Sequence, residues 1–267
     1  MKLIVLGSGT SVPHPRRASA AFWLETSAGS MLLDCGADAM HRMAEESLDW
    51  PNLDAIWISH LHLDHCGGLA SLLFGTKHSP QTQNRRKPLQ IFTCAGMRKL
   101  LKAIDESNNY RLFQQPFPIE LHEVAELTDQ QDRFALLPGV TAQTFSTPHT
   151  QESVAIRVTD AEGTSLVYTA DTGYSEALAD FAANVDLLIL ECSFPRDKPV
   201  ETHLDLNEAM SLAKIANPRM LLLTHLYPSW DGIDLEREAA KLWASKVVAA
   251  YDGLRLKVGP DGCLRDD

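Results

Sequence analysis

Short apolar runs recur along the chain and are separated by turn residues or by segments of helical composition. The runs at 53–58, 185–190 and 220–223 are almost wholly apolar, which is typical of buried strands. Further strands are expected at 2–6, 20–25, 30–34, 89–93, 119–123, 134–137, 140–146, 153–158 and 165–169, and helices at 37–46, 69–74, 97–104 and 207–216. The alternation of buried strands with helices predicts a layered α/β fold.

Two stretches stand apart from this alternation. Residues 107–118 are rich in Asn, Gln and Pro and are expected to form an irregular connection that borders a substrate cleft. Residues 235–251 are amphipathic. They form either a surface for a second copy of the chain or a helix that covers the protein's own core, and the pattern leaves both open.

The densest group of chemically versatile residues is the run SHLHLDHCGG at 59–68. His60 and His62 are two positions apart, so an extended backbone points both to the same side. Asp64 and His65 come where the strand should end and a turn begin, so they face a different point. Imidazoles crowded together would repel one another once protonated, and a divalent cation removes this problem by holding them neutral. The run therefore favours ligands for two neighbouring metal ions over unrelated polar residues of a surface loop.

Titratable residues also follow the later apolar strands. His149, Asp171, Glu191 and His225 each stand at the end of a predicted strand, as His60 does. Ligands that emerge at one edge of a layered sheet core form one site with the strands as a rigid frame. Asp171 has an ordinary alternative as a helix N-cap, although the nearby Ser175 suits that position too.

Asp34 has two interpretations between which the sequence does not choose. It ends a predicted strand in the segment Asp34-Cys35-Gly36, and Asp and Gly are common turn residues. A carboxylate at this place could also orient a ligand imidazole.

The length of 267 residues allows one large α/β domain or two small ones, and a composition of 45% hydrophobic and 22% charged residues is typical of globular proteins. We expect a single domain spanning 1–267. The five cysteines are scattered without a CxxC pair, so neither a disulfide framework nor a cysteine-rich zinc site is indicated. Cys66 and Cys192 are expected to be buried packing residues.

Charge and hydropathy limit the classes of partner that we expect for this protein. The net charge of −11 disfavours a broad surface for nucleic acid, since only 15–17 and 85–87 offer basic clusters. The apolar stretch at 2–6 is too short for a signal peptide, and no run is long enough to span a bilayer. We therefore expect a cytoplasmic protein without a membrane partner.

The pattern His-x-His-x-Asp-His, followed by a lone His, a lone Asp and a lone His after successive strands, resembles the metallo-β-lactamase superfamily over residues 33–225. The resemblance implies an αββα four-layer sandwich, in which two mixed β-sheets are flanked by helices and the metals lie at one edge. Carried over residue by residue, it implies two divalent metal ions, most readily Zn²⁺, with Mn²⁺ or Fe²⁺ as alternatives. The implied ligands are His60, His62 and His149 for one metal and Asp64, His65 and His225 for the other, with Asp171 bridging the two.

Two further stretches resemble the ribonuclease Z and related phosphodiesterase branch. One is LGSGTSVP at 6–13 followed by Arg17 and Ser19, and the other is THLDL at 202–206. The resemblance implies that His203 assists at the scissile phosphate, so Asp64 and His203 are the expected catalytic residues; the ordinary alternative for His203 is a surface residue near a helix cap. The aspartate at position 171 resembles the residue found there in hydrolases of phosphodiesters, thioesters and lactones. It differs from the cysteine that a subfamily of β-lactamases has at this position.

One departure from ribonuclease Z affects the expected substrate. The family's tRNA-gripping arm lies between the equivalents of His149 and Asp171, which here are only 22 positions apart, enough for a hairpin alone. We therefore expect hydrolysis of small or cyclic phosphodiesters by a metal-bridging hydroxide. The alternatives are tRNA 3′-processing, thioester or lactone hydrolysis of the glyoxalase II kind, and, least favoured, a non-catalytic binding protein. A homodimer is a further expectation from the resemblance.

Overall fold

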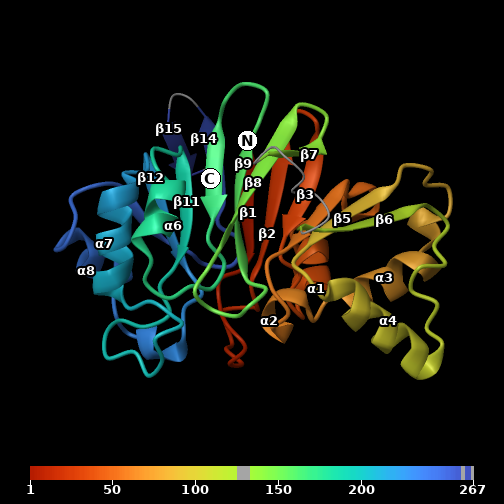
Figure 1. The fold of residues 1–267 in the computed structure, drawn as a ribbon, viewed down its shortest axis with the longest axis horizontal. Coiled ribbons are helices and arrows are strands. Elements are labelled where there is room, and N and C mark those ends of the chain that lie inside the picture. Colours follow the sequence, from red (N-terminus) through yellow and green to blue (C-terminus); the bar gives the residue numbers. More distant parts are fainter. Residues whose placement is uncertain (125–132, 260–261, 266–267) are drawn as a thin grey trace.

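A computed structural model describes residues 1–124, 133–259 and 262–265, and its strands form two sheets packed face to face (Figure 1). The first sheet has eight strands in the order β15-β14-β1-β2-β3-β4-β5-β6. They are β1 (Lys2–Gly7), β2 (Ala21–Thr26), β3 (Gly29–Leu33), β4 (Ala55–Ile58), β5 (Leu89–Thr93), β6 (Ile119–Glu123), β14 (Arg255–Gly259) and β15 (Gly262–Arg265). Strands β3 to β6 run parallel, so their carboxyl ends meet at one edge.

The second sheet has seven strands in the order β13-β12-β11-β10-β9-β8-β7. They are β7 (Phe134–Leu137), β8 (Val140–Ser146), β9 (Val154–Thr159), β10 (Ser165–Tyr168), β11 (Leu187–Glu191), β12 (Met220–Thr224) and β13 (Val247–Ala249). Strands β10 to β13 are parallel. Both sheets thus combine parallel and antiparallel pairs.

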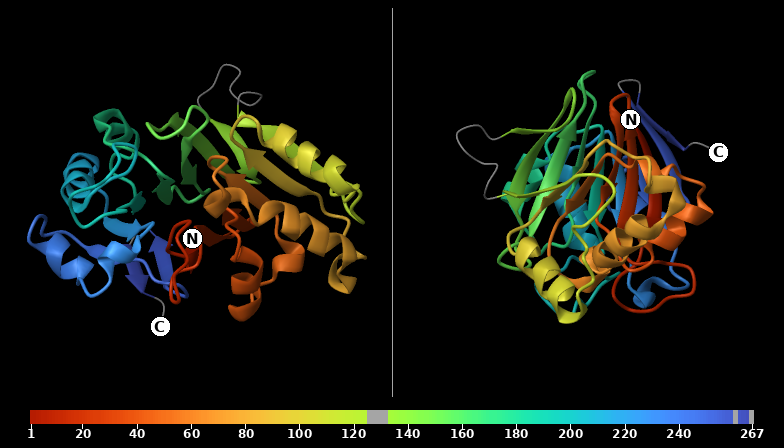
Figure 2. Two further views of the ribbon diagram at one scale, coloured as in Figure 1. Left: turned by 90° about the horizontal axis from the view of Figure 1, so that it is seen from below. Right: turned by 90° about the vertical axis from the view of Figure 1, so that its right-hand side faces the viewer.

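Helices cover the outer face of each sheet, as the views in Figure 2 show. The first sheet is covered by α1 (Ala39–Glu45), α3 (Leu69–His78) and α4 (Met97–Asn108), and the second by α6 (Glu176–Phe181), α7 (Leu206–Ala216) and α8 (Leu235–Ala240). Short helical turns complete the elements: α2 (Leu63–Cys66), η1 (Trp50–Asn52), η2 (Pro80–Thr82) and η3 (Pro228–Trp230). This arrangement is the αββα sandwich that the sequence resemblance implied.

Alternation along the strands explains the layers. In β1, Leu3 and Val5 point between the sheets, whereas Ile4 and Leu6 point to the outer helices. Successive side chains of a strand face opposite sides, so a strand covered on both sides must be apolar throughout. The predicted runs at 185–190 and 220–223 are almost wholly apolar for the same reason, with Asp186 as the exception.

The structure corrects three expectations. Residues 235–251 do not form one helix, because α8 ends at Ala240 and β13 follows within the same stretch. The strands β14 and β15 were not expected; β14 pairs antiparallel with β1 and extends the first sheet. Asp64 and His65 lie in α2 rather than in an open turn. The irregular segment at 107–118 is confirmed from residue 109 onward.

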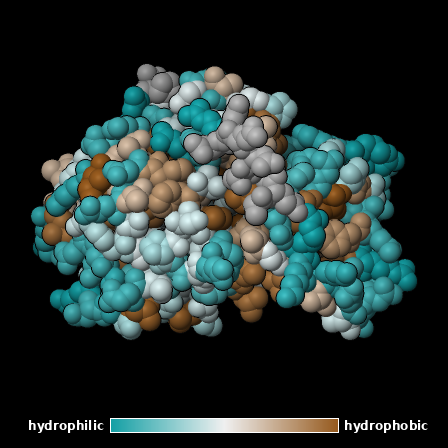
Figure 3. All heavy atoms as spheres, viewed as in Figure 1, coloured by the Kyte–Doolittle hydropathy of each residue, from teal (hydrophilic) through white to brown (hydrophobic). Residues whose placement is uncertain are grey.

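The surface in Figure 3 is largely hydrophilic, with apolar residues in separate groups, in keeping with the mean hydropathy of −0.14. Among the described residues, none of the helices has the length and apolar character needed to cross a membrane. That the chain forms a single domain over 1–267 stays a prediction.

Candidate metal centre

The histidine run lies where β4 leaves the sheet. His60 follows β4 and is fully buried, whereas His62 is exposed at the start of α2. The single turn of α2 then turns Asp64 and His65 back into the protein, where both are buried. A strand followed by one helical turn therefore lets neighbouring residues face two different points.

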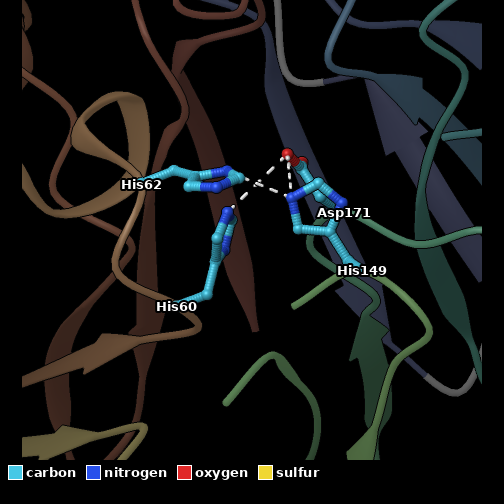
Figure 4. Close-up of side chains that lie close together, drawn as sticks. All are labelled: His60, His62, His149 and Asp171. Carbon is cyan, nitrogen blue, oxygen red and sulfur yellow. Dashed lines mark hydrogen bonds and ion pairs between the residues drawn. The ribbon is translucent and has the colours of Figure 1, made fainter. Parts of the chain in front are cut away.

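The first group of side chains joins His60, His62, His149 and Asp171 (Figure 4). The Nε2 atom of His149 lies 3.1 Å from Nδ1 of His62. Oδ2 of Asp171 lies 3.8 Å from Nε2 of His60 and 3.6 Å from Nε2 of His149. These ligand atoms converge on one point from residues far apart in the sequence.

The second group contains Asp64, His65 and His225. Oδ2 of Asp64 lies 3.4 Å from Nε2 of His225 and 3.8 Å from Nε2 of His65. Oδ1 of Asp171 lies 3.2 Å from Nε2 of His65 and 3.3 Å from Nε2 of His225. The two carboxylate oxygens of Asp171 thus face different groups, and Asp171 stands between them.

Hydrogen bonds at the far side of each ring fix which nitrogen faces the centre. Nδ1 of His65 donates to Asp34 over 2.6 Å. The Ser59 hydroxyl donates to Asp34 over 2.8 Å and can therefore accept from Nδ1 of His60, 3.0 Å away. With these Nδ1 atoms protonated, the Nε2 atoms of His60 and His65 present lone pairs to the centre.

His149 and His225 are oriented in the same way from the second sheet. Nδ1 of His149 donates to the carbonyl of Thr202 over 2.9 Å. The Ser193 hydroxyl donates to Glu191 over 2.6 Å, which leaves it to accept from Nδ1 of His225, 3.0 Å away. Lone pairs of imidazoles from both sheets therefore converge on the oxygens of Asp171.

This donor set fits divalent cations. Nε2 of His60, Nε2 of His65 and Oδ1 of Asp171 are buried without a hydrogen-bond partner. Ring lone pairs aimed at a carboxylate repel it, and a cation between them converts that repulsion into coordination. Nitrogen and oxygen donors of this kind suit zinc and related ions.

Burial and neighbouring charges set the ionisation of these groups. Burial, together with the nearby His65, lowers the pKa of His60 to about 2, so this imidazole is neutral. Burial raises the pKa of Asp64, but the nearby imidazoles of His225 and His65 outweigh burial and lower that pKa to about 2. Burial also opposes ionisation of Asp171, yet His225 and His65 keep its pKa well below the usual range. Both carboxylates are therefore ionised at neutral pH.

His203 lies next to a histidine of each group. Its ring centroid is 4.8 Å from that of His149 and 5.3 Å from that of His225. Nδ1 of His203 lies 2.9 Å from Oε1 of Glu191. Burial lowers the pKa of His203, but its contact with Glu191 outweighs burial and raises that pKa above the ordinary value. His203 is thus a buried imidazole beside the cluster, not a surface residue.

The structure decides between several interpretations. Asp34 accepts hydrogen bonds from His65, Ser59 and Tyr168, so it orients a ring of the cluster. Ser175 is the N-cap of α6, which leaves Asp171 free for the centre. Cys66 and Cys192 are buried, as expected.

Apart from Asp34, the residues that position the rings could not be recognised from the sequence. Ser59, Tyr168 and Ser193 are common residue types, and nothing in their spacing distinguishes them. Glu191 was recognised only by its place at a strand end. In the fold it accepts from Ser193 and from the backbone of Thr172 and Leu204 while contacting His203. Such partners become visible only once the strands are assembled.

Known proteins resemble this chain over most of its length. A family model described as "Anti-Pycsar protein Apyc1" matches residues 1–246. The chain is 25% identical to the ribonuclease Z of Ignicoccus hospitalis, over 94% of this chain and 96% of the relative. It is 28% identical to the probable metallo-hydrolase YhfI of Bacillus subtilis, over 95% of this chain and 98% of the relative.

Solved structures agree with the fold. The metallo-β-lactamase fold protein YhfI from Bacillus subtilis superposes with a TM-score of 0.76 at 25% identity, covering 95% of this chain and 98% of that one. The short form of human tRNase Z superposes with a TM-score of 0.75 at 22% identity, covering 97% of this chain and all (100%) of the other. The resemblance drawn from the sequence is confirmed.

Proposed function

Because this chain belongs to the Anti-Pycsar protein Apyc1 family, whose model spans residues 1–246, we propose that it hydrolyses small or cyclic phosphodiesters at a pair of divalent cations. Its relatives are named as hydrolases, and the chain itself is a metal-dependent hydrolase of the metallo-β-lactamase fold. One observation above all supports the dinuclear part of the proposal. The two oxygens of Asp171 face two separate groups of ligand atoms.

In the proposal, His60, His62 and His149 hold one cation, Asp64, His65 and His225 hold the second, and Asp171 bridges them. Zinc is the first choice of metal, with manganese or iron as alternatives. Bound cations of this kind lower the pKa of water toward neutrality and offset the negative charge of phosphoryl oxygens. Ionised Asp64 fits the role of an anionic ligand that faces the reacting water, and its low pKa excludes it as a proton donor at neutral pH.

His203 is proposed to act on the phosphoryl group. Glu191 holds its Nδ1 atom at 2.9 Å, so that Nδ1 carries the proton and Nε2 is left for the substrate. The raised pKa increases the share of doubly protonated imidazole. In that form Nε2–H can stabilise negative charge on a phosphoryl oxygen or donate a proton to the departing alkoxide.

A tRNA precursor is the second candidate substrate, since several relatives are named ribonuclease Z. Against it, the interval between His149 and Asp171 is taken up by the hairpin of β9 and β10, both of which belong to the second sheet. The net charge of −11 also disfavours a large polyanion as substrate.

Hydrolysis of thioesters or lactones would use the same metal site to attack a carbonyl carbon instead of phosphorus. Cytoplasmic location and a homodimer stay predictions.

A hydrolysis screen tests the proposal. Metal-loaded protein is offered bis-p-nitrophenyl phosphate, cyclic nucleotides, a thioester, a lactone and a tRNA precursor, and bound metal is counted by plasma mass spectrometry. We expect turnover of the phosphodiesters and about two metal ions per chain. Turnover confined to the thioester or lactone, or protein that stays metal-free when offered zinc, manganese or iron, would contradict the proposal.

A further inference from the structure

Two aromatic rings lie together beside the metal centre. Phe194 and Tyr227 stack with their ring centroids 4.7 Å apart and their planes 25° apart. Phe194 follows Glu191, the last residue of β11, and Tyr227 follows His225 just beyond β12. The two strands are parallel neighbours, so both rings leave the second sheet at the edge that bears the metal ligands.

The rings are close to the reaction centre without being stacked on it. The Tyr227 centroid lies 5.9 Å from that of His225 and 6.1 Å from that of His203, and the ring planes are 74° and 68° apart. Phe194 lies 6.4 Å from His203 at 73°. The aromatic pair therefore lies next to His203, the residue proposed to act on the phosphoryl group.

The pair is held in place without being part of the core. The amide of Phe194 donates to the carbonyl of Leu204, and that of Tyr227 to the carbonyl of Ser193. The Tyr227 hydroxyl lies near the side chain of Ser11, in the loop after β1. Within the described chain both rings remain half-buried and outside the apolar clusters, whereas the adjacent Leu226 and Trp230 pack into the core beneath.

We infer that Phe194 and Tyr227 form a stacking surface for the base of a nucleotide substrate, an inference that rests on the proposed function. A diester with its phosphorus beside His203 and His225 would extend a substituent past these rings, and the aromatic pair lies next to both of them. Stacking on an aromatic side chain suits any base, because every base has a π face. The preferred substrates would then be base-bearing phosphodiesters, with little discrimination between bases.

The test compares a 3′,5′-cyclic nucleotide with its abasic counterpart, 1-deoxyribose 3′,5′-cyclic phosphate. We expect wild-type protein to prefer the base-bearing diester in kcat/KM by about tenfold, chiefly through KM. Tyr227→Leu should remove most of that preference, and Phe194→Leu should weaken it. Tyr227→Phe, which keeps the ring and loses the hydroxyl, should retain it. Phe74→Leu removes an exposed ring (44%) from α3, on the outer face of the first sheet, and serves as the control.

The outcomes separate the inference from the function on which it rests. Loss of preference in Tyr227→Leu, with metal content equal to wild type, supports the stacking surface. If wild-type protein cleaves both diesters equally well, or if Tyr227→Leu changes KM for both by the same factor, the inference is wrong and the proposed function stands. If wild-type protein cleaves bis-p-nitrophenyl phosphate but neither cyclic diester, the inference is wrong and the proposed function stands. If it cleaves none of the three, the proposed function itself fails and the inference fails with it.

Discussion

Asp34 shows how one buried carboxylate fixes several residues of the centre. It accepts from the amide and the hydroxyl of Ser59, each at 2.8 Å, and from Nδ1 of His65 and the hydroxyl of Tyr168, each at 2.6 Å. Its own backbone has φ 58°, a left-handed conformation that Asp and Asn tolerate better than most residues. Two rings of the candidate metal centre, those of His60 and His65, thereby depend on this side chain.

Asp34→Asn is expected to weaken metal binding and stability together. Asparagine suits the left-handed backbone and the space, but its NH₂ group cannot accept from Ser59, His65 or Tyr168. We expect metal affinity to fall by about 10- to 100-fold and the free energy of unfolding by roughly 2 kcal/mol. Metal titration and urea unfolding measure both quantities, with the exposed Asp180→Asn as control. A variant with wild-type affinity would show that the network does not orient the ligands.

His203→Ala is expected to reduce turnover while metal content stays at the wild-type level. The imidazole is proposed to act on the phosphoryl group, and loss of such a group typically costs about a hundredfold or more in kcat. Steady-state kinetics on bis-p-nitrophenyl phosphate, paired with metal analysis, measures the two effects separately. Unchanged kcat would remove His203 from the mechanism, and lost metal would make it a ligand, as its closeness to Asp171 and His225 allows.

At the scale of elements, the ends of strands determine where the chemistry lies. Beyond β3, β10 and β12 the chain turns through left-handed residues at Asp34, Ala170 and His225, with φ of 58°, 52° and 58°. Such conformations cost free energy and persist where the surrounding structure enforces them. These sharp turns redirect the chain at the sheet edge, so that ligands follow directly from rigid strands.

The segment that bears His203 is anchored in turn by the start of α7. Asp205 caps the helix by accepting from the amide of Glu208, and the Glu208 side chain accepts from the amide of Asp205. Asp205→Ala should lower the free energy of unfolding by about 1 kcal/mol, because amides of the first turn lose their acceptor. Asp205→Asn keeps an acceptor and serves as control. Equal loss in both variants, measured by urea unfolding, would show that charge rather than capping matters.

Across the whole molecule, the centre joins the two sheets. His60, His62, Asp64 and His65 come from the first sheet, whereas His149, Asp171 and His225 follow strands of the second. A cation held by both sets would link the sheets at one edge, in addition to the contacts of the apolar layer between them.

Removal of metal should therefore destabilise the entire fold. A ligand that binds only the folded state, at about a hundred times its Kd, raises the melting temperature of a protein of this size by about 5 to 10 °C. Calorimetry with and without chelator should show a fall of that order. In Asp171→Ala, which lacks the proposed bridge, the melting temperature should respond little to chelator. An equal fall in wild type and variant would contradict the bridging role.

The sequence by itself determined the local features. Apolar runs predicted most strands because a strand covered on both faces must be apolar throughout, and the spacing of His60, His62, Asp64 and His65 indicated metal ligands within one short segment. It missed β14 and β15 and took 235–251 for one amphipathic unit, because short strands have weak patterns and depend on their pairing partners.

Only the tertiary structure decided which distant residues meet. It brought His149, Asp171 and His225 to the first histidine run, and it turned the two oxygens of Asp171 toward different ligand groups. The partners of the rings, such as Asp34, Ser193 and Glu191, belong to residue types that serve many ordinary purposes. Their role depends on distances of about 3 Å between atoms of different strands, and no pattern along one strand encodes such distances.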